Sequence, residues 1–141
     1  MVAISLPDGS VRNFDGPVTG AALAADIGPG LAKAALAIKV DGELRDLMHE
    51  IEADATVEIV TRDHDDALEL LRHDAAHVFA EAVQELYPET QITFGPAIED
   101  GFYYDFHREE PFTPDDFEAM EKRMQEIVDR DEEISREVWD R

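Results

Sequence analysis

The longest run of helical hydrophobic spacing lies between residues 65 and 87, where no glycine or proline interrupts the chain before Pro88. At about 100° per residue, its apolar residues fall on one broad arc. They are Leu68, Leu71, Ala75, Val78, Phe79, Ala82, Val83 and Leu86. His73 and His77, one helical turn apart, fall nearly opposite this arc, on a side that Leu70, Ala80 and Gln84 share. We therefore expect a long amphipathic helix that presents two imidazoles away from its apolar face.

The spacing then changes from helical to alternating. Residues 91–95 read as a short strand, and Asp100-Gly101 is a hairpin signal. Phe102, Tyr104 and Phe106 alternate onto one face of the strand that follows. We expect both phenylalanines to pack under the hairpin, whereas Tyr104 has a hydroxyl that needs a partner and suits a cleft equally well.

A second amphipathic helix is predicted after this hairpin. Thr113 is a suitable cap, Pro114 suits the first helical position, and acidic residues occupy the first turn. The apolar residues at helical spacing are Phe117, Met120, Met124, Ile127 and Val128. The methionines read as core filler at these positions. Residues 134–139 begin another strand pattern without a partner, so we expect a unit that continues into a longer protein.

The first 61 residues alternate short strands with turn signals. Strands are predicted at 2–6, 10–14, 36–40, 43–48 and 56–60, and helical segments at 21–27 and 31–35. Thr19 is the expected cap of the first helix, and Gly28 is expected to end it in the left-handed conformation. Asp41-Gly42 is the expected turn between two strands. This order predicts a compact α+β domain with a mixed sheet holding one helix.

Composition places the chain among soluble globular proteins, with 44% hydrophobic and 33% charged residues. No apolar run approaches the roughly 20 residues of a membrane span. The start shows no basic leader and the chain has no cysteine, so a reducing, cytoplasmic location is expected. The net charge of −22 excludes a broad nucleic-acid-binding surface. Residues 1–61 carry −6 and the remainder −16, so any contact with RNA should be local.

Several motifs occur together in an order and spacing typical of one family. They are His73-Asp74-Ala75-Ala76-His77, Leu86-Tyr87-Pro88, the run from Gly95-Pro96 through Asp100-Gly101-Phe102-Tyr103-Tyr104-Asp105-Phe106, and Phe112-Thr113-Pro114. From residue 2 to the end, the chain resembles the amino-terminal region of bacterial threonyl-tRNA synthetases. Ile27 to Ala34 and the Val40-Asp41-Gly42 turn resemble a TGS domain, which has the β-grasp, ubiquitin-like fold. The resemblance implies a TGS domain at 1–61 and a partial α+β editing domain at 62–141, incomplete at its carboxyl end.

The resemblance also implies a chemistry. Editing domains of this kind hydrolyse serine wrongly attached to the threonine tRNA, and imidazoles suit the positioning of water and proton transfer. His73 and His77 are the expected catalytic residues, with Tyr104 and the Gly95 backbone as substrate-binding candidates. Related domains add a later Cys-x-x-x-His pair. This chain has no cysteine and only His107 downstream, so we expect it to be inactive alone. We also expect it to hold no metal, because His73 and His77 are only two ligands and two ligands rarely hold zinc.

The parent enzyme implied by the resemblance joins threonine to the acceptor end of its tRNA. It is expected to be a cytoplasmic homodimer that uses ATP, magnesium and zinc at sites outside this sequence.

Three other readings stay open from the residues alone. His-x-x-x-His is by itself a weak motif. In the first alternative, His73 and His77 are two solvated surface histidines without a function. A free-standing regulatory or RNA-binding TGS module would use cations such as Lys33 and Lys39. A metal-dependent hydrolase would hold its ion on the histidine pair. His64 reads as a surface residue in a charged joint. Asp74 stands where many members of the family have a small polar residue, and two alternatives stay open for it, that it tunes His77 or that it faces solvent.

Overall fold

A computed structural model describes residues 1–133, 137, 139 and 140. The chain divides into two compact units, residues 1–67 and 68–141. The strand predicted at 134–139 lies outside the described residues. Each unit is a separate α+β structure, in agreement with the predicted fold class.

The first unit is built on a mixed five-stranded sheet with the order β2-β1-β7-β4-β5. The strands are β1 (Val2–Ser5), β2 (Val11–Phe14), β4 (Ala37–Val40), β5 (Glu43–Arg45) and β7 (Ala55–Val60). β1 and β7 are parallel, and the other neighbours are antiparallel. The mixed sheet predicted from the sequence is therefore confirmed, although β5 ends three residues before the predicted Met48.

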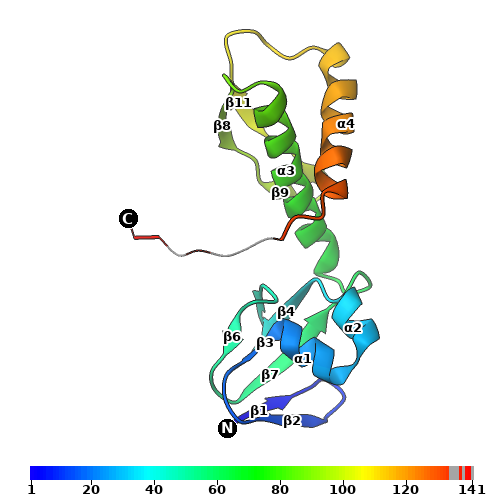
Figure 1. The fold of residues 1–141 in the computed structure, drawn as a ribbon, viewed down its shortest axis with the longest axis vertical. Coiled ribbons are helices and arrows are strands. Elements are labelled where there is room, and N and C mark those ends of the chain that lie inside the picture. The colour runs from blue at the N-terminus through cyan, green and yellow to red at the C-terminus, as the bar shows by residue number, and fades with distance from the viewer. Residues whose placement is uncertain (134–136, 138, 141) are drawn as a thin grey trace. The chain divides into compact units, whose positions relative to one another are not determined.

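One side of this sheet carries the helices α1 (Gly20–Ile27) and α2 (Pro29–Ala34) (Figure 1). The core between them is apolar, and Ile4, Leu23, Ile38 and Val57 are fully buried. A small antiparallel pair, β3 (Val18–Thr19) with β6 (Glu50–Ile51), was not predicted. Two residues per strand are too few for alternation to be recognised in the sequence.

Local turn chemistry explains several element boundaries in the first unit. The Thr19 hydroxyl accepts a hydrogen bond from the Ala22 amide at 3.2 Å, as expected of a helix cap. Asp41 and Gly42 both have positive φ, +50° and +86°, as a tight two-residue hairpin turn requires. The left-handed ending predicted for Gly28 is wrong, since its φ is 169° and its ψ 153°. Gly28 precedes Pro29, and the proline ring pushes the preceding residue into extended conformations.

Two side chains of the first unit form contacts with carboxylates that the sequence did not predict. Lys39 forms an ion pair with Asp66 at 2.7 Å, and this hydrogen bond raises the pKa of the ammonium group. His64 is only 17% exposed, and its ring bonds to the Glu58 carboxylate at 2.9 Å. Lys39 is thus occupied by a carboxylate rather than available to a phosphate.

The second unit centres on a long helix, α3 (Ala67–Leu86), which contacts a second helix and a pair of nested hairpins. The outer hairpin pairs β8 (Gln91–Phe94) with β11 (Asp105–His107), and the inner one pairs β9 (Ala97–Ile98) with β10 (Gly101–Phe102). Ile98 pairs with Gly101, so the turn residues are Glu99 and Asp100. The predicted Asp100-Gly101 turn is therefore displaced by one residue, and Gly101 begins β10 with a φ of +154°.

The apolar arc predicted for α3 is wrong in part. Leu68 and Leu71 are 56% and 40% exposed, whereas Ala76 and Ala80 are buried. Periodicity identifies apolar residues, but the elements packed against a helix decide which of them are covered. Ala76 directly precedes His77 and Ala80 follows it by three residues, so the histidines flank a buried face rather than oppose it.

The helix α4 (Pro114–Asp129) begins as predicted. Asp116 accepts hydrogen bonds from the Thr113 amide and hydroxyl, which forms a capping box. The Tyr87 hydroxyl donates to Asp116 at 2.8 Å, so the end of α3 is tied to the start of α4. Met120 and Ile127 are buried and Met124 is partly buried, so the core assignment holds fully only for Met120 among the two methionines. Phe117 and Val128 of the predicted apolar face are 53% and 57% exposed.

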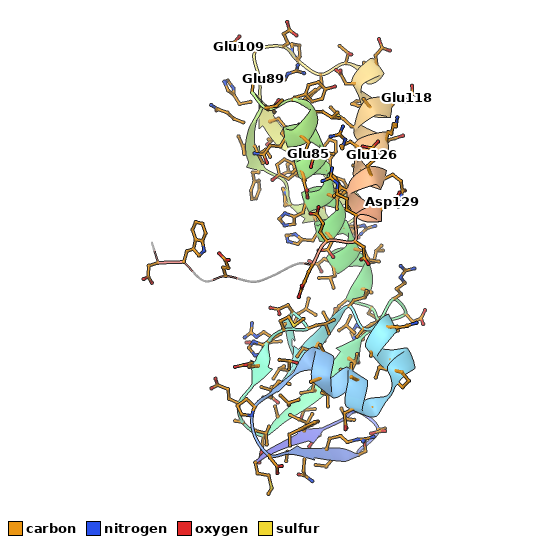
Figure 2. The ribbon with its side chains drawn as sticks, viewed as in Figure 1. Glu85, Glu89, Glu109, Glu118, Glu126 and Asp129 are labelled. Atoms are coloured by element: carbon orange, nitrogen blue, oxygen red, sulfur yellow. The ribbon has the colours of Figure 1, made fainter. Side chains whose placement is uncertain are left out.

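Ion pairs join the two helices at Glu85 (Figure 2). Its carboxylate lies 2.9 Å from Arg123 and 2.7 Å from Arg130, both on or just after α4. Hydrogen bonds from Arg130 and then Arg123 lower the pKa of Glu85 to about 2. A single carboxylate on α3 thus accepts hydrogen bonds from two arginines of the α4 segment.

This pairing predicts a pH-dependent stability. A carboxylate whose pKa is depressed on folding stabilises the fold fully above its unfolded pKa of 4.5, and the contribution is lost as the pH falls towards 2. Glu85→Gln should therefore flatten the fall in melting temperature between pH 5 and pH 2.5, relative to the unchanged chain. Glu118→Gln is the matched control, since Glu118 on α4 has no ion pair among the described residues. Equal slopes for all three proteins would contradict the assignment.

Candidate functional site

The two predicted histidines lie side by side on the exposed flank of α3. Their Nε2 atoms are 3.1 Å apart, and the ring centroids are 4.6 Å apart at an interplanar angle of 83°. One Nε2 must donate and the other accept in this contact, so a proton already lies between the two rings, and the electron pair of the accepting nitrogen is engaged by it. When a water replaces this contact, one Nε2 is left to accept a proton from the water, which is the role of a general base.

Aromatic rings fasten the hairpins to the same helix. The ring of Phe79 on α3 contacts Phe102 at 6.1 Å and Phe106 at 5.6 Å between centroids. Both phenylalanines are half-buried, in agreement with their predicted packing under the hairpin. Tyr104 stacks on Phe106 at 4.9 Å with nearly parallel rings.

Gly95 and Tyr104, the two predicted substrate-binding residues, contact each other. A Cβ atom on residue 95 would lie 1.9 Å from Cδ2 of the Tyr104 ring and 2.5 Å from its Cγ. Only a residue without a side chain allows the ring to lie here. The packing of Tyr104 therefore accounts for the glycine, and a role of either residue towards a substrate stays a prediction.

Arg72, directly before His73, was not among the predicted site residues. Its guanidinium donates to the backbone carbonyl of Ile98 at 3.4 Å and to that of Glu99. The arginine thus ties the tip of the β9–β10 hairpin to the helix that bears the histidines. Sequence patterns carry no signal for a side chain that bonds to backbone carbonyls 26 and 27 residues away.

An open groove of about 400 Å³ lies elsewhere in the second unit. It is lined by Glu89, Gln91, His107, Arg108, Glu109 and Glu110. Glu89 and Glu109, which both line the groove, lie beyond the end of α3 (Figure 2). Arg108 lies over the rings of Tyr87 and Phe112, 4.4 Å and 4.9 Å from their centroids, and pairs with Glu89. None of the four predicted site residues lines this groove.

Two further properties concern the whole described part of the chain. Within residues 1–133 and the few described after them, no three histidine, aspartate or glutamate side chains are arranged to hold a metal ion. None of the described helices is long and apolar enough to cross a membrane.

Comparison with known proteins finds one family model for the first part of the chain and close relatives along its full length. Residues 2–61 match the family model of the TGS domain, so the first unit contains a TGS domain. Over its full length, the chain is 68% identical to the threonine–tRNA ligase of Paramagnetospirillum magneticum. It is 67% identical to the ligases of Rhodospirillum rubrum and Thiobacillus denitrificans. The chain spans 22% of the length of each of these relatives. The resemblance to the amino-terminal, TGS-containing region of threonine–tRNA ligases is thereby confirmed.

Proposed function

We propose that this chain is the front part of a threonine–tRNA ligase and that residues 62–141 contribute the histidine half of its editing site. The observation that carries the proposal is the convergence of His73 and His77, whose Nε2 atoms are 3.1 Å apart on an exposed flank of α3. Two solvated histidines have no need to bring their ring nitrogens together, whereas a hydrolytic site needs its catalytic groups to converge on one bound water or substrate.

The reaction is hydrolysis of the ester that joins serine to the tRNA. Water attacks the ester carbonyl carbon, and an imidazole accepts the proton that the water loses. The C–O bond to the ribose breaks, and the ribose oxygen takes up a proton as serine leaves. Editing is needed because a threonine pocket gains only about 1–3 kcal/mol from the methyl group that serine lacks.

The remaining roles belong to the complete protein. We infer that it ligates threonine to tRNA(Thr) with ATP, magnesium and zinc, as a cytoplasmic homodimer. The net charge of −22 implies that this region meets the tRNA only at its acceptor end, because a strongly acidic surface repels the phosphate backbone. Cationic surfaces elsewhere in the complete protein would hold the rest of the tRNA.

The proposal predicts different activities for the chain and for the complete ligase. With purified Ser-tRNA(Thr), the complete protein should release serine well above the uncatalysed rate, and residues 1–141 alone should not. The chain supplies one pair of imidazoles and no cysteine, so it lacks the second half expected of the site. Turnover by the isolated chain would show that the histidine pair is sufficient. No turnover by the complete protein would contradict the editing assignment.

A further inference from the structure

We propose that Arg72 is a positioning residue for the editing site, because it holds the tip of the β9–β10 hairpin against the helix that carries the histidine pair. The inference rests on the proposed editing function for its catalytic consequence. Its structural part, that Arg72 fixes the tip, stands on contacts that can be tested separately.

The hairpin tip has little else to hold it. β9 and β10 contain two residues each and pair only through Ile98 with Gly101 and Ala97 with Phe102. Ile98 is 47% exposed, and Glu99 and Asp100 are also exposed, so few side chains anchor the turn. Two-stranded hairpins of this size are marginal without external contacts.

Arg72 supplies such a contact. Its Nη1 atom carries two N–H groups and donates to the neighbouring carbonyls of Ile98 and Glu99. Its hydrogen bonds go to these carbonyls although the chain has 34 acidic residues. Among the described residues, no carboxylate forms an ion pair with it. The contact therefore serves geometry rather than the neutralisation of charge.

The contact lies next to the proposed site. Arg72 and His73 are consecutive, so their Cα atoms are about 3.8 Å apart. The hairpin continues from its tip into Phe102, which contacts Phe79, and then into Tyr104. Fixing the tip on Arg72 therefore fixes the spacing between the aromatic segment and the imidazoles. Small displacements of groups around a reacting centre lower the rate without removing any catalytic group.

The structural part is tested by hydrogen exchange of the 141-residue chain. Arg72→Ala should speed amide exchange in residues 97–103 by about tenfold or more, the equivalent of one charge-assisted hydrogen bond. Exchange in β8 and β11 should stay unchanged. Arg72→Lys keeps a donor and should give an intermediate rate. Lys122→Ala, which also removes one positive charge from this unit, is the control and should leave residues 97–103 unaffected. If Arg72→Ala does not fold, Arg72→Lys decides, and unchanged exchange at the tip overturns the proposal.

The catalytic part is tested in the complete ligase. Arg72→Ala should lower kcat for Ser-tRNA(Thr) deacylation about tenfold with little change in KM, and Arg72→Lys should recover part of the loss. If Arg72 only stabilised the fold, Arg72→Ala would lower the melting temperature. A fall in kcat at constant KM and constant melting temperature, partly restored by Arg72→Lys, would not be expected. If His73→Ala abolishes deacylation but Arg72→Ala does not slow it, the Arg72 proposal fails alone. If Arg72→Ala loosens the tip but His73→Ala leaves deacylation intact, the editing function fails instead.

Discussion

Replacing His73 or His77 by alanine in the complete ligase is expected to slow deacylation of Ser-tRNA(Thr) by about 10²–10⁴-fold, the usual contribution of a general acid or base. The two Nε2 atoms lie 3.1 Å apart, so removal of either ring takes away the shared proton position. Ligation of threonine to tRNA should stay near its normal rate, because the role proposed for the pair concerns the editing reaction alone. Single-turnover deacylation and aminoacylation assays measure the two rates.

The controls for this prediction lie in the same unit. His107 is exposed on β11 and pairs with Gln91, so His107→Ala removes an imidazole without touching the histidine pair. It should leave deacylation within about twofold of normal. Because residues that act as a unit are not additive, the double variant His73→Ala with His77→Ala should lose little more than either single variant. Full activity of both single variants would remove the catalytic role.

The second large effect is expected for Gly95→Ala. The new Cβ would lie 1.9 Å from the Tyr104 ring, and the contact includes the ring Cγ, so a flip of the ring about its Cβ–Cγ bond does not relieve it. Tyr104 must leave its stacked position on Phe106, or the loop must move. Overpacking of this kind costs about 1–3 kcal/mol of the free energy of unfolding. Denaturant unfolding of the second unit, followed through its tyrosines, measures the loss.

Two further variants isolate the cause. Gly16→Ala adds the same methyl group where no atom lies within 4 Å, and it should leave stability almost unchanged. Tyr104→Ala in the Gly95→Ala background removes the ring that clashes, so the penalty of the glycine change should disappear in that pair. If Gly95→Ala costs as much without Tyr104 as with it, the close approach of the ring is not the reason for the glycine.

Local chemistry made much of the fold predictable. Thr19 and Thr113 are the N-cap residues of α1 and α4. Asp41 and Gly42 both adopt the positive φ that their turn needs. The alternation of strands and helix in the first 61 residues was sufficient to predict the mixed sheet. Each of these features depends on residues within a few positions of one another, so one sequence is enough to recognise it.

Contacts between distant residues could not be predicted in the same way. Three contacts of this kind join separate segments of the second unit. They are the close approach of Tyr104 to Gly95, the ion pairs of Glu85 with Arg123 and Arg130, and the hydrogen bonds from Arg72 to the hairpin tip. Each depends on how the elements pack. The prediction for Gly28 failed for a different reason, since two local rules competed there and the restriction before proline prevailed over the left-handed helix end.

By itself, the sequence determined that His73 and His77 share one helix at a spacing of one turn, because helical periodicity depends only on the order of residues. Tertiary structure decided where that pair lies relative to the rest of the unit. The packed structure buries Ala76 and Ala80 and leaves Leu68 and Leu71 exposed. The buried face of the helix is therefore closer to the histidines than the sequence predicted. Which side chains of a helix are buried depends on the element that packs against it, and that packing depends on contacts between residues far apart in the sequence.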